Sequence, residues 1–140
     1  MAQTVRDVMT ANPRAVDAND PIIDAARIMR DDDVGAVIVK QDGGRVAGIV
    51  TDRDIVVRAL ADDRDPGETS VGEIASKDLV ALSPDDTLER AADVMREKSV
   101  RRLPVMQGEQ PVGIVSIGDL AIENDSESAL ADISAAPANN

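Results

Sequence analysis

The sequence contains no Phe, Tyr or Trp, no Cys and no His. Without aromatic rings, any hydrophobic core must be built from Val, Ile, Leu, Ala and Met, which make up the whole hydrophobic fraction of 43%. Without cysteine the chain forms neither a disulfide nor a thiolate metal site. Without histidine it lacks the commonest general base and the commonest transition-metal ligand. Ser-His-Asp, Cys-His and His-zinc chemistries are excluded together, so we expect neither an enzyme nor a metal centre.

Positive charge is also scarce. The chain has 15 Lys and Arg residues against 27 Asp and Glu residues, a formal net charge of −12. Because binding to nucleic acid or to an anionic membrane depends largely on cationic side chains, this balance argues against both as partners. No apolar run approaches the ~18 residues of a membrane-spanning helix, and the N-terminus lacks a signal-peptide pattern. We therefore expect a cytoplasmic protein.

An internal repeat is the strongest feature that is present. Residues 25–30 (AARIMR) match residues 91–96 (AADVMR) at an offset of 66. Residues 48–51 (GIVT) match residues 113–116 (GIVS) at an offset of 65, because one residue is lost in the preceding turn of the second copy. The two copies cover nearly all of residues 4–122. A repeat of this extent predicts two small units of the same architecture.

Within each copy, the hydrophobic pattern predicts the element order β-α-β-β-α. Asp20 is expected to cap a helix whose first residue is Pro21, with apolar residues recurring at i, i+3, i+4 and i+7, and Asp86 begins the matching helix. A further helix opens at Thr51 and is expected to have one apolar face, made of Ile55, Val56, Ala59 and Leu60. The expected strands of the first copy are 15–16, 34–39 and 46–50, the last two joined by a glycine-containing loop at 41–45.

The repeat also sets the expected domain limits. The expected segments are a first domain at 4–62, a linker at 63–70, a second domain at 71–123 and a polar, disordered tail at 124–140. Pro104 stands where the first copy has Ile38. Since proline has no N–H for a strand ladder, we expect Pro104 at a sheet edge or facing away from a partner strand.

The duplicated order, the Val-Arg-Arg-Leu-Pro-Val segment at 100–105 and two Gly-Ile-Val-[Thr/Ser]-x-x-Asp motifs resemble a pair of CBS domains, also called a Bateman module. The stretch at 51–60 is most similar to stand-alone actinobacterial pairs. The resemblance implies an α/β (α+β) fold of two β-α-β-β-α repeats packed about a pseudo-twofold axis, with two clefts between them, and a homodimer. It also implies an adenosine-type ligand (AMP, ADP or ATP), no required cofactor and an unknown protein effector.

The family's nucleotide signature falls on Thr51 and Asp54, and again on Ser116 and Asp119. The resemblance implies that the carboxylate accepts hydrogen bonds from the ribose hydroxyls while the hydroxyl contacts phosphate or ribose. The same spacing at a strand-to-helix junction is also typical of a capping box, in which both side chains bind the first free N–H groups of the helix. The two interpretations are compatible, and the sequence leaves both open.

Arg101 and Arg102 stand where the first copy has Gly35 and Ala36. The resemblance implies that such residues contact phosphate, and the alternative is that they form surface salt bridges. The expected second-copy cleft comprises Arg101, Arg102, Ser116 and Asp119 with Thr10, Val16 and Val34, and the other cleft comprises Thr51 and Asp54 with Ser76, Val80 and Val100. With no aromatic residue available, adenine would lie between aliphatic side chains and be read by backbone groups.

Two functions remain after these exclusions. The first is a regulatory module that binds an adenosine-type ligand in the inter-domain cleft and signals through a conformational or dimer change. The alternative is a ligand-free dimeric scaffold or interaction protein of a stress response. The acidic run at 31–33 lacks the spacing of a cation site, and we interpret it as a solvated helix end.

Overall fold

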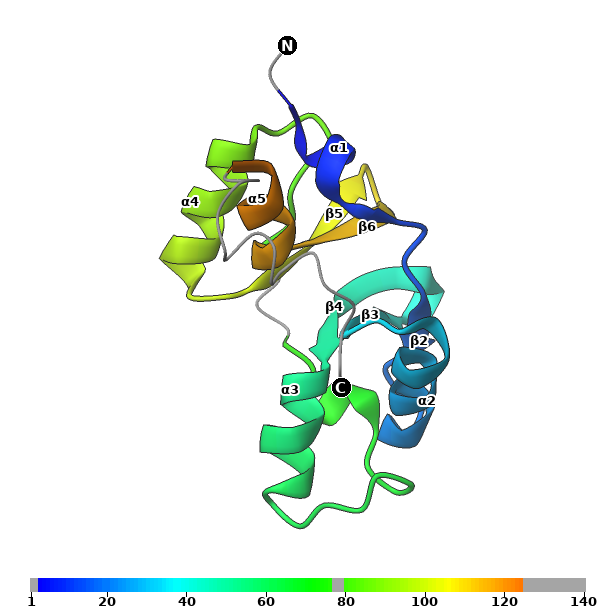
Figure 1. Cartoon of the computed structure of the whole chain (residues 1–140). Helices are drawn as coiled ribbons and strands as arrows, with labels where there is room; N and C mark the ends of the chain where they lie inside the picture. The colour runs from blue at the N-terminus through cyan, green and yellow to red at the C-terminus, as the bar shows by residue number, and fades with distance from the viewer. Residues whose placement is uncertain (1–2, 77–79, 125–140) are drawn as a thin grey trace. The chain divides into compact units, whose positions relative to one another are not determined.

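A computed structural model describes residues 3–76 and 80–124, with side chains as far as residue 121 (Figure 1). The chain forms two compact units, which we call unit 1 (Met1–Asn12 with Val80–Asn140) and unit 2 (Pro13–Leu79). The tail predicted at 124–140 lies almost wholly outside the described residues. No helix in the part that the structure describes has the length and apolar character needed to cross a membrane.

Unit 2 contains a three-stranded mixed sheet covered by helices on one face. Its elements are β2 (Ala15–Asp17), α2 (Ile22–Asp32), β3 (Ala36–Gln41), η1 (Asp42–Gly44), β4 (Arg45–Thr51), α3 (Asp52–Asp54), η2 (Ile55–Leu60) and η3 (Val71–Glu73). The strand order is β2-β3-β4, with β2 parallel and β4 antiparallel to β3. Val37, Val39 and Val50 form one core with Ile22 of α2 and Ala59 of η2, so both helices pack on the same sheet face.

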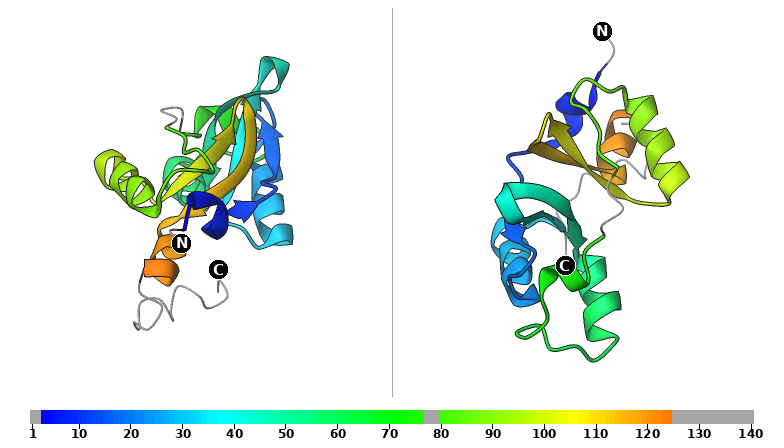
Figure 2. Two further views of the ribbon diagram at one scale, coloured as in Figure 1. Left: turned by 90° about the horizontal axis from the view of Figure 1, so that it is seen from above. Right: turned by 180° about the vertical axis from the view of Figure 1, so that it is seen from behind.

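Unit 1 repeats this plan. Its elements are α1 (Val5–Val8), β1 (Thr10–Ala11), α4 (Leu88–Lys98), β5 (Arg102–Gln107), β6 (Gln110–Ser116) and α5 (Ile117–Asn124). The strand order is β1-β6-β5, and both pairs are antiparallel. Helices α4 and α5 lie side by side against this sheet (Figures 1 and 2). The core joins Met95 and Leu120 of these helices to Val105 and Val115 of the strands. The mixed fold class expected from the sequence is confirmed.

The opening segment of each repeat packs on the other repeat. In unit 1 the Val5 N–H donates to Asp86 O at 2.9 Å, and in unit 2 the Val71 N–H donates to Asp20 O at 2.8 Å. The two donors are 66 residues apart, and so are the two acceptors, which is the offset of the repeat. The same exchange of opening segments therefore occurs in both units. A contiguous range such as 4–62 therefore marks one repeat in the sequence. The compact units differ from the repeats, because each unit contains the opening segment of the other repeat.

Residues 63–70, expected as a linker, lie on unit 2. The Ile22 N–H donates to Thr69 O at 2.9 Å, and the Ile23 N–H donates to Pro66 O at 3.0 Å. The first N–H groups of a helix have no partner within it, and here this segment supplies the partners for α2. Thr69 is consequently buried.

The long helices begin one residue later than the sequence suggested. Pro21 is the N-cap of α2 and keeps an extended backbone (φ −70°, ψ 151°), because it pairs with Ser70. The Asp20 carboxylate instead accepts the Asp17 N–H at 3.0 Å. In α4 the cap is Thr87, whose hydroxyl accepts a backbone N–H at 3.0 Å, in place of Asp86.

Pro104 confirms the expectation of an edge position, since β5 lies at the edge of its sheet. In unit 2 the N–H of Ile38 donates to Arg14 O at 2.9 Å. Pro104 cannot make the equivalent bond. Accordingly the parallel pairing on this side is a single bridge between Leu82 and Val105, whereas β2 pairs with β3 over three residues.

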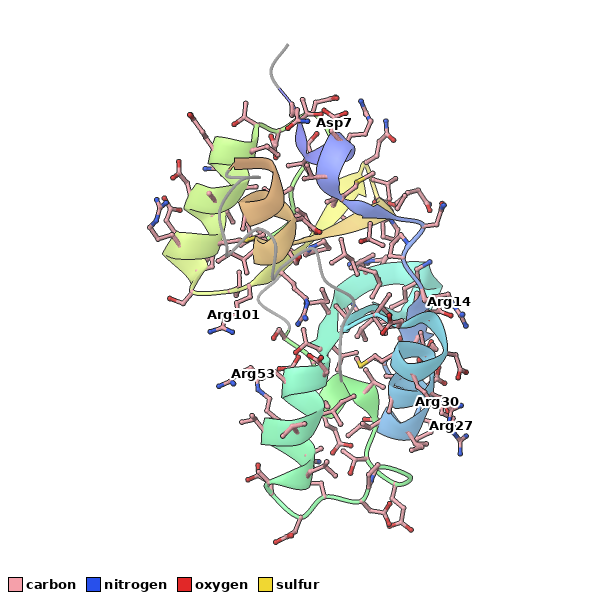
Figure 3. The ribbon with its side chains drawn as sticks, in the orientation of Figure 1. Asp7, Arg14, Arg27, Arg30, Arg53 and Arg101 are labelled. Atoms are coloured by element: carbon pink, nitrogen blue, oxygen red, sulfur yellow. The ribbon has the colours of Figure 1, made fainter. Side chains whose placement is uncertain are left out.

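The acidic run at 31–33 lies at the exposed end of α2. Asp31 forms an ion pair with Arg30 at 2.8 Å, and Asp32 forms one with Arg14 at 3.0 Å. Figure 3 shows both arginines beside α2. Asp33 ends the helix in the left-handed conformation (φ 54°), which Asp tolerates better than most residues. The run thus acts as a solvated helix end, as expected.

The π-helical form of η2 corrects the expected apolar face of this segment. Val56 and Leu60 are exposed by 55% and 53%, whereas Ile55 and Ala59 pack in the core. The Ala61 N–H bonds to Val56 O, five residues back, so the turns are wider than in an α-helix. The four residues therefore do not share one buried face, and the expectation of a single apolar face was wrong.

Candidate functional site

Each unit has a strand-to-helix junction closed by a capping box. In unit 1 the Ser116 N–H donates to Asp119 Oδ2 at 2.8 Å, and the Asp119 N–H donates to Ser116 Oγ at 3.2 Å. In unit 2 the corresponding bonds join Thr51 and Asp54 at 2.9 Å and 3.1 Å. The capping interpretation is confirmed in both copies. Because each cap uses only Oδ2 of the carboxylate, Oδ1 retains its capacity to accept further hydrogen bonds.

The two carboxylates differ in their surroundings. Asp54 is only 9% exposed, and its Oδ1 lies 3.8 Å from Nε of Arg58. Arg58 also donates from Nη1 to Ile74 O at 3.2 Å, which holds the guanidinium beside this carboxylate. Asp119 is half-buried, and the residue that corresponds to Arg58 in the second copy is Glu123. The second copy therefore lacks this arginine beside its carboxylate.

The arginine pair lies beside the junction of unit 1. Arg102 opens β5 directly opposite Ser116 on β6, and the Ile117 N–H donates to Arg101 O at 2.9 Å. Arg101 is exposed and projects away from the ribbon of its unit (Figure 3). The backbone of unit 2 has the same arrangement, with Gly35 and Ala36 in these positions. The fold of unit 1 thus brings the backbone of the arginine pair next to the junction that carries Ser116 and Asp119.

The remaining residues of the expected site are divided between the units. Unit 1 carries Thr10, Val80 and Val100, and unit 2 carries Val16, Val34 and Ser76. Val16 is only 6% exposed and packs in the core of unit 2, so any contact with a ligand would fall to its backbone. The grouping of these residues into two clefts stays a prediction.

The sequence analysis did not single out Arg58 as a neighbour of Asp54. Its position, four residues after Asp54 on one helix, was the available signal, because residues spaced i and i+4 are neighbours on a helix surface. Its second contact, with Ile74 O, depends on the segment at 70–76 packing on the first repeat, which the sequence pattern did not reveal.

Two α+β units with matching junctions and exchanged opening segments define a duplicated module. The family model for the CBS domain matches residues 5–60 and 71–123. The chain therefore belongs to the CBS domain family and carries two CBS domains.

Sequence relatives of similar length support this assignment. The chain is 41% identical to the CBS domain-containing protein YhcV of Bacillus subtilis over 135 residues, which are 94% of this chain and 95% of that protein. It is 36% identical to hypoxic response protein 1 of Mycobacterium tuberculosis over 118 residues, covering 84% of this chain and 82% of that protein. The second relative agrees with the resemblance to stand-alone CBS pairs.

Solved structures give the same result. The crystal structure of hypoxic response protein I with two coordinated zinc ions has a TM-score of 0.74 at 36% identity and covers 85% of this chain and 97% of that one. A hexameric CBS-CP12 protein from bloom-forming cyanobacteria has a TM-score of 0.83 at 29% identity, covering 92% and 77%. Zinc in the present chain would require carboxylates alone, and the described residues bring together no group of three or more His, Cys, Asp or Glu side chains that could hold a metal ion.

Proposed function

We propose that the chain is a regulatory CBS-pair module that binds the ribose and phosphate of an adenosine-type ligand (AMP, ADP or ATP) at the β6–α5 junction of unit 1. The observation that carries this proposal is the gathering of Arg101 and Arg102 beside Ser116 and Asp119. In a chain with a net charge of −12, two adjacent arginines at a strand-to-helix junction form a local site for an anion.

Each side chain can act within the geometry of the junction. Oδ1 of Asp119 accepts a ribose hydroxyl while Oδ2 keeps its bond to the Ser116 N–H. The Ser116 hydroxyl accepts the Asp119 N–H and still has its own proton to donate to a phosphate oxygen. Guanidinium groups bind phosphate through paired, charge-assisted hydrogen bonds. The cap therefore orients the two side chains for the ligand.

The junction of unit 2 is the weaker candidate for the same ligand. It has Gly35 and Ala36 in place of the arginines, so it offers phosphate no cation at these two positions. Arg58 also lies beside Oδ1 of Asp54, the oxygen that ribose would need. We propose that unit 1 provides the higher-affinity site.

Regulation requires that the ligand bind one conformational state more tightly than another. We propose a cytoplasmic homodimer whose conformation or self-association responds to the ligand and is recognised by a separate protein effector. CBS proteins of this type are regulatory or of unknown function, and we propose no catalytic activity. Self-association is supported by the hexameric assembly named for one structural neighbour.

A second candidate is a ligand-free scaffold of a stress response, without bound nucleotide. The observation that favours it is that Asp54 and Asp119 both form caps, so each has a structural reason to be present. The name of hypoxic response protein 1 supports a stress setting for that relative. A direct binding measurement distinguishes the two functions.

Isothermal titration calorimetry with AMP, ADP and ATP tests the proposal. Asp119→Asn keeps a side-chain acceptor for the cap but removes the charge, and Asp54→Asn is the matched change in unit 2. We expect Asp119→Asn, and separately Arg101→Ala with Arg102→Ala, to weaken binding by about tenfold or more, since charged hydrogen bonds contribute roughly 1.5–3 kcal/mol each. Asp54→Asn should bind nearly as tightly as the unaltered chain. Equal heats in all four proteins would refute this assignment of the site, and no heat in any of them would support the scaffold instead.

A further inference from the structure

Unit 2 contains a surface cavity of about 520 Å³ that shares no lining residue with its strand-to-helix junction. This volume lies within the range of roughly 300–1,000 Å³ that is typical of small-molecule sites. The cavity is lined by Ala18, Asn19, Val39, Gln41, Ala47, Ser70, Gly72, Glu73 and Ala75. Val39 and Ala75 are buried in the core and form an apolar floor, whereas Asn19 and Gln41 are exposed at the rim.

The cavity depends on small side chains at a place where two backbone segments meet. The Gly72 N–H donates to Ala18 O at 2.8 Å, and a Cβ on Gly72 would lie 3.1 Å from the Ala18 Cβ. Ala47 and Ala75 leave space beside this contact. Backbone hydrogen bonding thus holds this part of the cavity wall in place.

The equivalent place in unit 1 carries larger side chains. The repeat and the matching hydrogen bonds define which residues correspond. The pairs, with the residue of unit 2 first, are Ala18 and Pro84, Asn19 and Asp85, Ala47 and Val112, Gly72 and Arg6, and Ala75 and Met9. All five positions therefore differ in side-chain size or charge, while the backbone pairing is the same.

These larger side chains occupy the space in unit 1. Met9 and Val112 pack against its hydrophobic core, and the Met9 side chain lies so close to Gly113 that an added Cβ there would overlap it. Arg6 forms an ion pair with Asp85 at 3.0 Å. The residues that line the cavity of unit 2 therefore differ from those at the equivalent place in unit 1.

The polar groups of the cavity indicate the charge of its ligand. The charged lining residue is Glu73, whose Oε2 accepts the Ser70 N–H at 2.7 Å and whose Oε1 accepts from Arg64 at 2.6 Å. The backbone N–H of Ser70 lowers the pKa of Glu73, so this carboxylate is ionised at neutral pH. Asn19 and Gln41 add amide donors and acceptors. A carboxylate together with a chain charge of −12 disfavours an anion.

We propose that this cavity of unit 2 is a second ligand site, separate from the nucleotide site, for a small neutral or cationic organic molecule with an apolar ring system and a hydrogen-bonding arm. The ring covers the apolar floor, and the arm reaches the amide and carboxylate groups at the rim. Phosphate-bearing molecules are disfavoured at this site because its lining contains a carboxylate and no cationic side chain, and the nearby Arg64 is already paired with Glu73.

Three probes with one ring system and different charges test the proposal: tryptamine (cationic), tryptophol (neutral) and indole-3-acetate (anionic). Backbone amide NMR of the full chain reports binding at Ala47, Gly72 and Ala75. Because the protein has no aromatic residue, every ring-current shift arises from the probe. We expect saturable shifts with tryptamine and tryptophol, and about tenfold weaker binding of indole-3-acetate from the charge difference.

Filling the cavity with the residues of the second copy provides the matched variant. Ala47→Val with Ala75→Met should abolish the shifts, whereas Ala61→Met, an exposed position outside the cavity, should leave them unchanged. If the filled variant does not fold, Asn19→Ala with Gln41→Ala changes exposed side chains and should weaken tryptamine binding. Nucleotide titration of the same variants shows whether the nucleotide site is intact.

Three results would overturn the proposal. The first is the absence of a saturable shift at these amides with any probe. The second is unchanged tryptamine binding after the cavity is filled. The third is binding of indole-3-acetate as tight as that of tryptamine, which contradicts the ligand class.

Discussion

Replacing Val5 tests the exchange of opening segments between the two repeats. Residues near a chain end are usually the least important for stability, because termini fray. Val5 is an exception, because its side chain is fully buried in the core of unit 1. Val71 is its counterpart in unit 2 and is also fully buried. The structure thus predicts a core residue five positions from the N-terminus.

The size of the effect follows from the buried methyl groups. Val5→Ala removes two of them, worth about 0.8 kcal/mol each in transfer free energy. The cavity left behind adds a term of about 24 cal/mol per Å³, which brings the expected loss of unfolding free energy to roughly 2–3 kcal/mol. Val71→Ala should cost a similar amount, because both side chains are equally buried.

Urea unfolding followed by far-ultraviolet circular dichroism measures the loss, and native-state hydrogen exchange locates it. Val5→Ala should increase exchange at Val105 and Val115 in unit 1, and Val71→Ala should increase it at Val37 and Val39 in unit 2. If Val5→Ala instead loosens the strands of its own repeat, or leaves stability unchanged, the exchange of segments is refuted.

Three further predictions concern single contacts. Gly113→Ala should destabilise the fold by about 1–3 kcal/mol from overpacking, because the new Cβ would lie 2.8 Å from Met9 Cγ; adding Met9→Ala should recover part of the loss in urea unfolding. Thr51→Val removes the hydroxyl that accepts the Asp54 N–H and should cost about 1 kcal/mol in the same assay, whereas no loss would show that the cap contributes nothing. The pKa of Glu73 is lowered from 4.5 in the folded state, so its contribution to stability is present above 4.5 and is lost as the pH falls through the folded value. Glu73→Gln should reduce this acid-dependent fall in the melting temperature, and identical pH profiles would contradict the assignment.

The repeat and the alternation of apolar residues predicted the mixed fold class, the edge position of Pro104 and the order of elements from β2 to η2, because these depend on local chemistry. The additional elements α1 and β1 were not predicted, and the first strand expected in the second copy is only a single bridge at Leu82. The exchange of opening segments could not be predicted, because the hydrophobic pattern around Val5 and Val71 is the same whichever repeat these side chains pack on. The π-helical turn after Asp54 was missed because the expected apolar face assumed the narrower turns of an α-helix.

The candidate site was predicted in part. The spacing of Ser116 and Asp119 is typical of both a helix cap and the family's nucleotide signature, and the structure confirms the cap. Arg102 lies next to Ser116 because of the register of β5 and β6. The sequence alone does not specify this register, because the turn between the two strands has lost one residue relative to the first copy. The contact of Arg58 with Ile74 O depends on the exchanged segment and could not be anticipated.

Amide NMR of the full chain during titration with AMP is the direct test of ligand binding at the β6–α5 junction. We expect saturable shifts centred on Ser116, Ile117 and Asp119 of unit 1, with smaller shifts at Thr51 and Asp54 of unit 2. Shifts centred on Thr51 and Asp54, or no saturable shift at either junction, would contradict it.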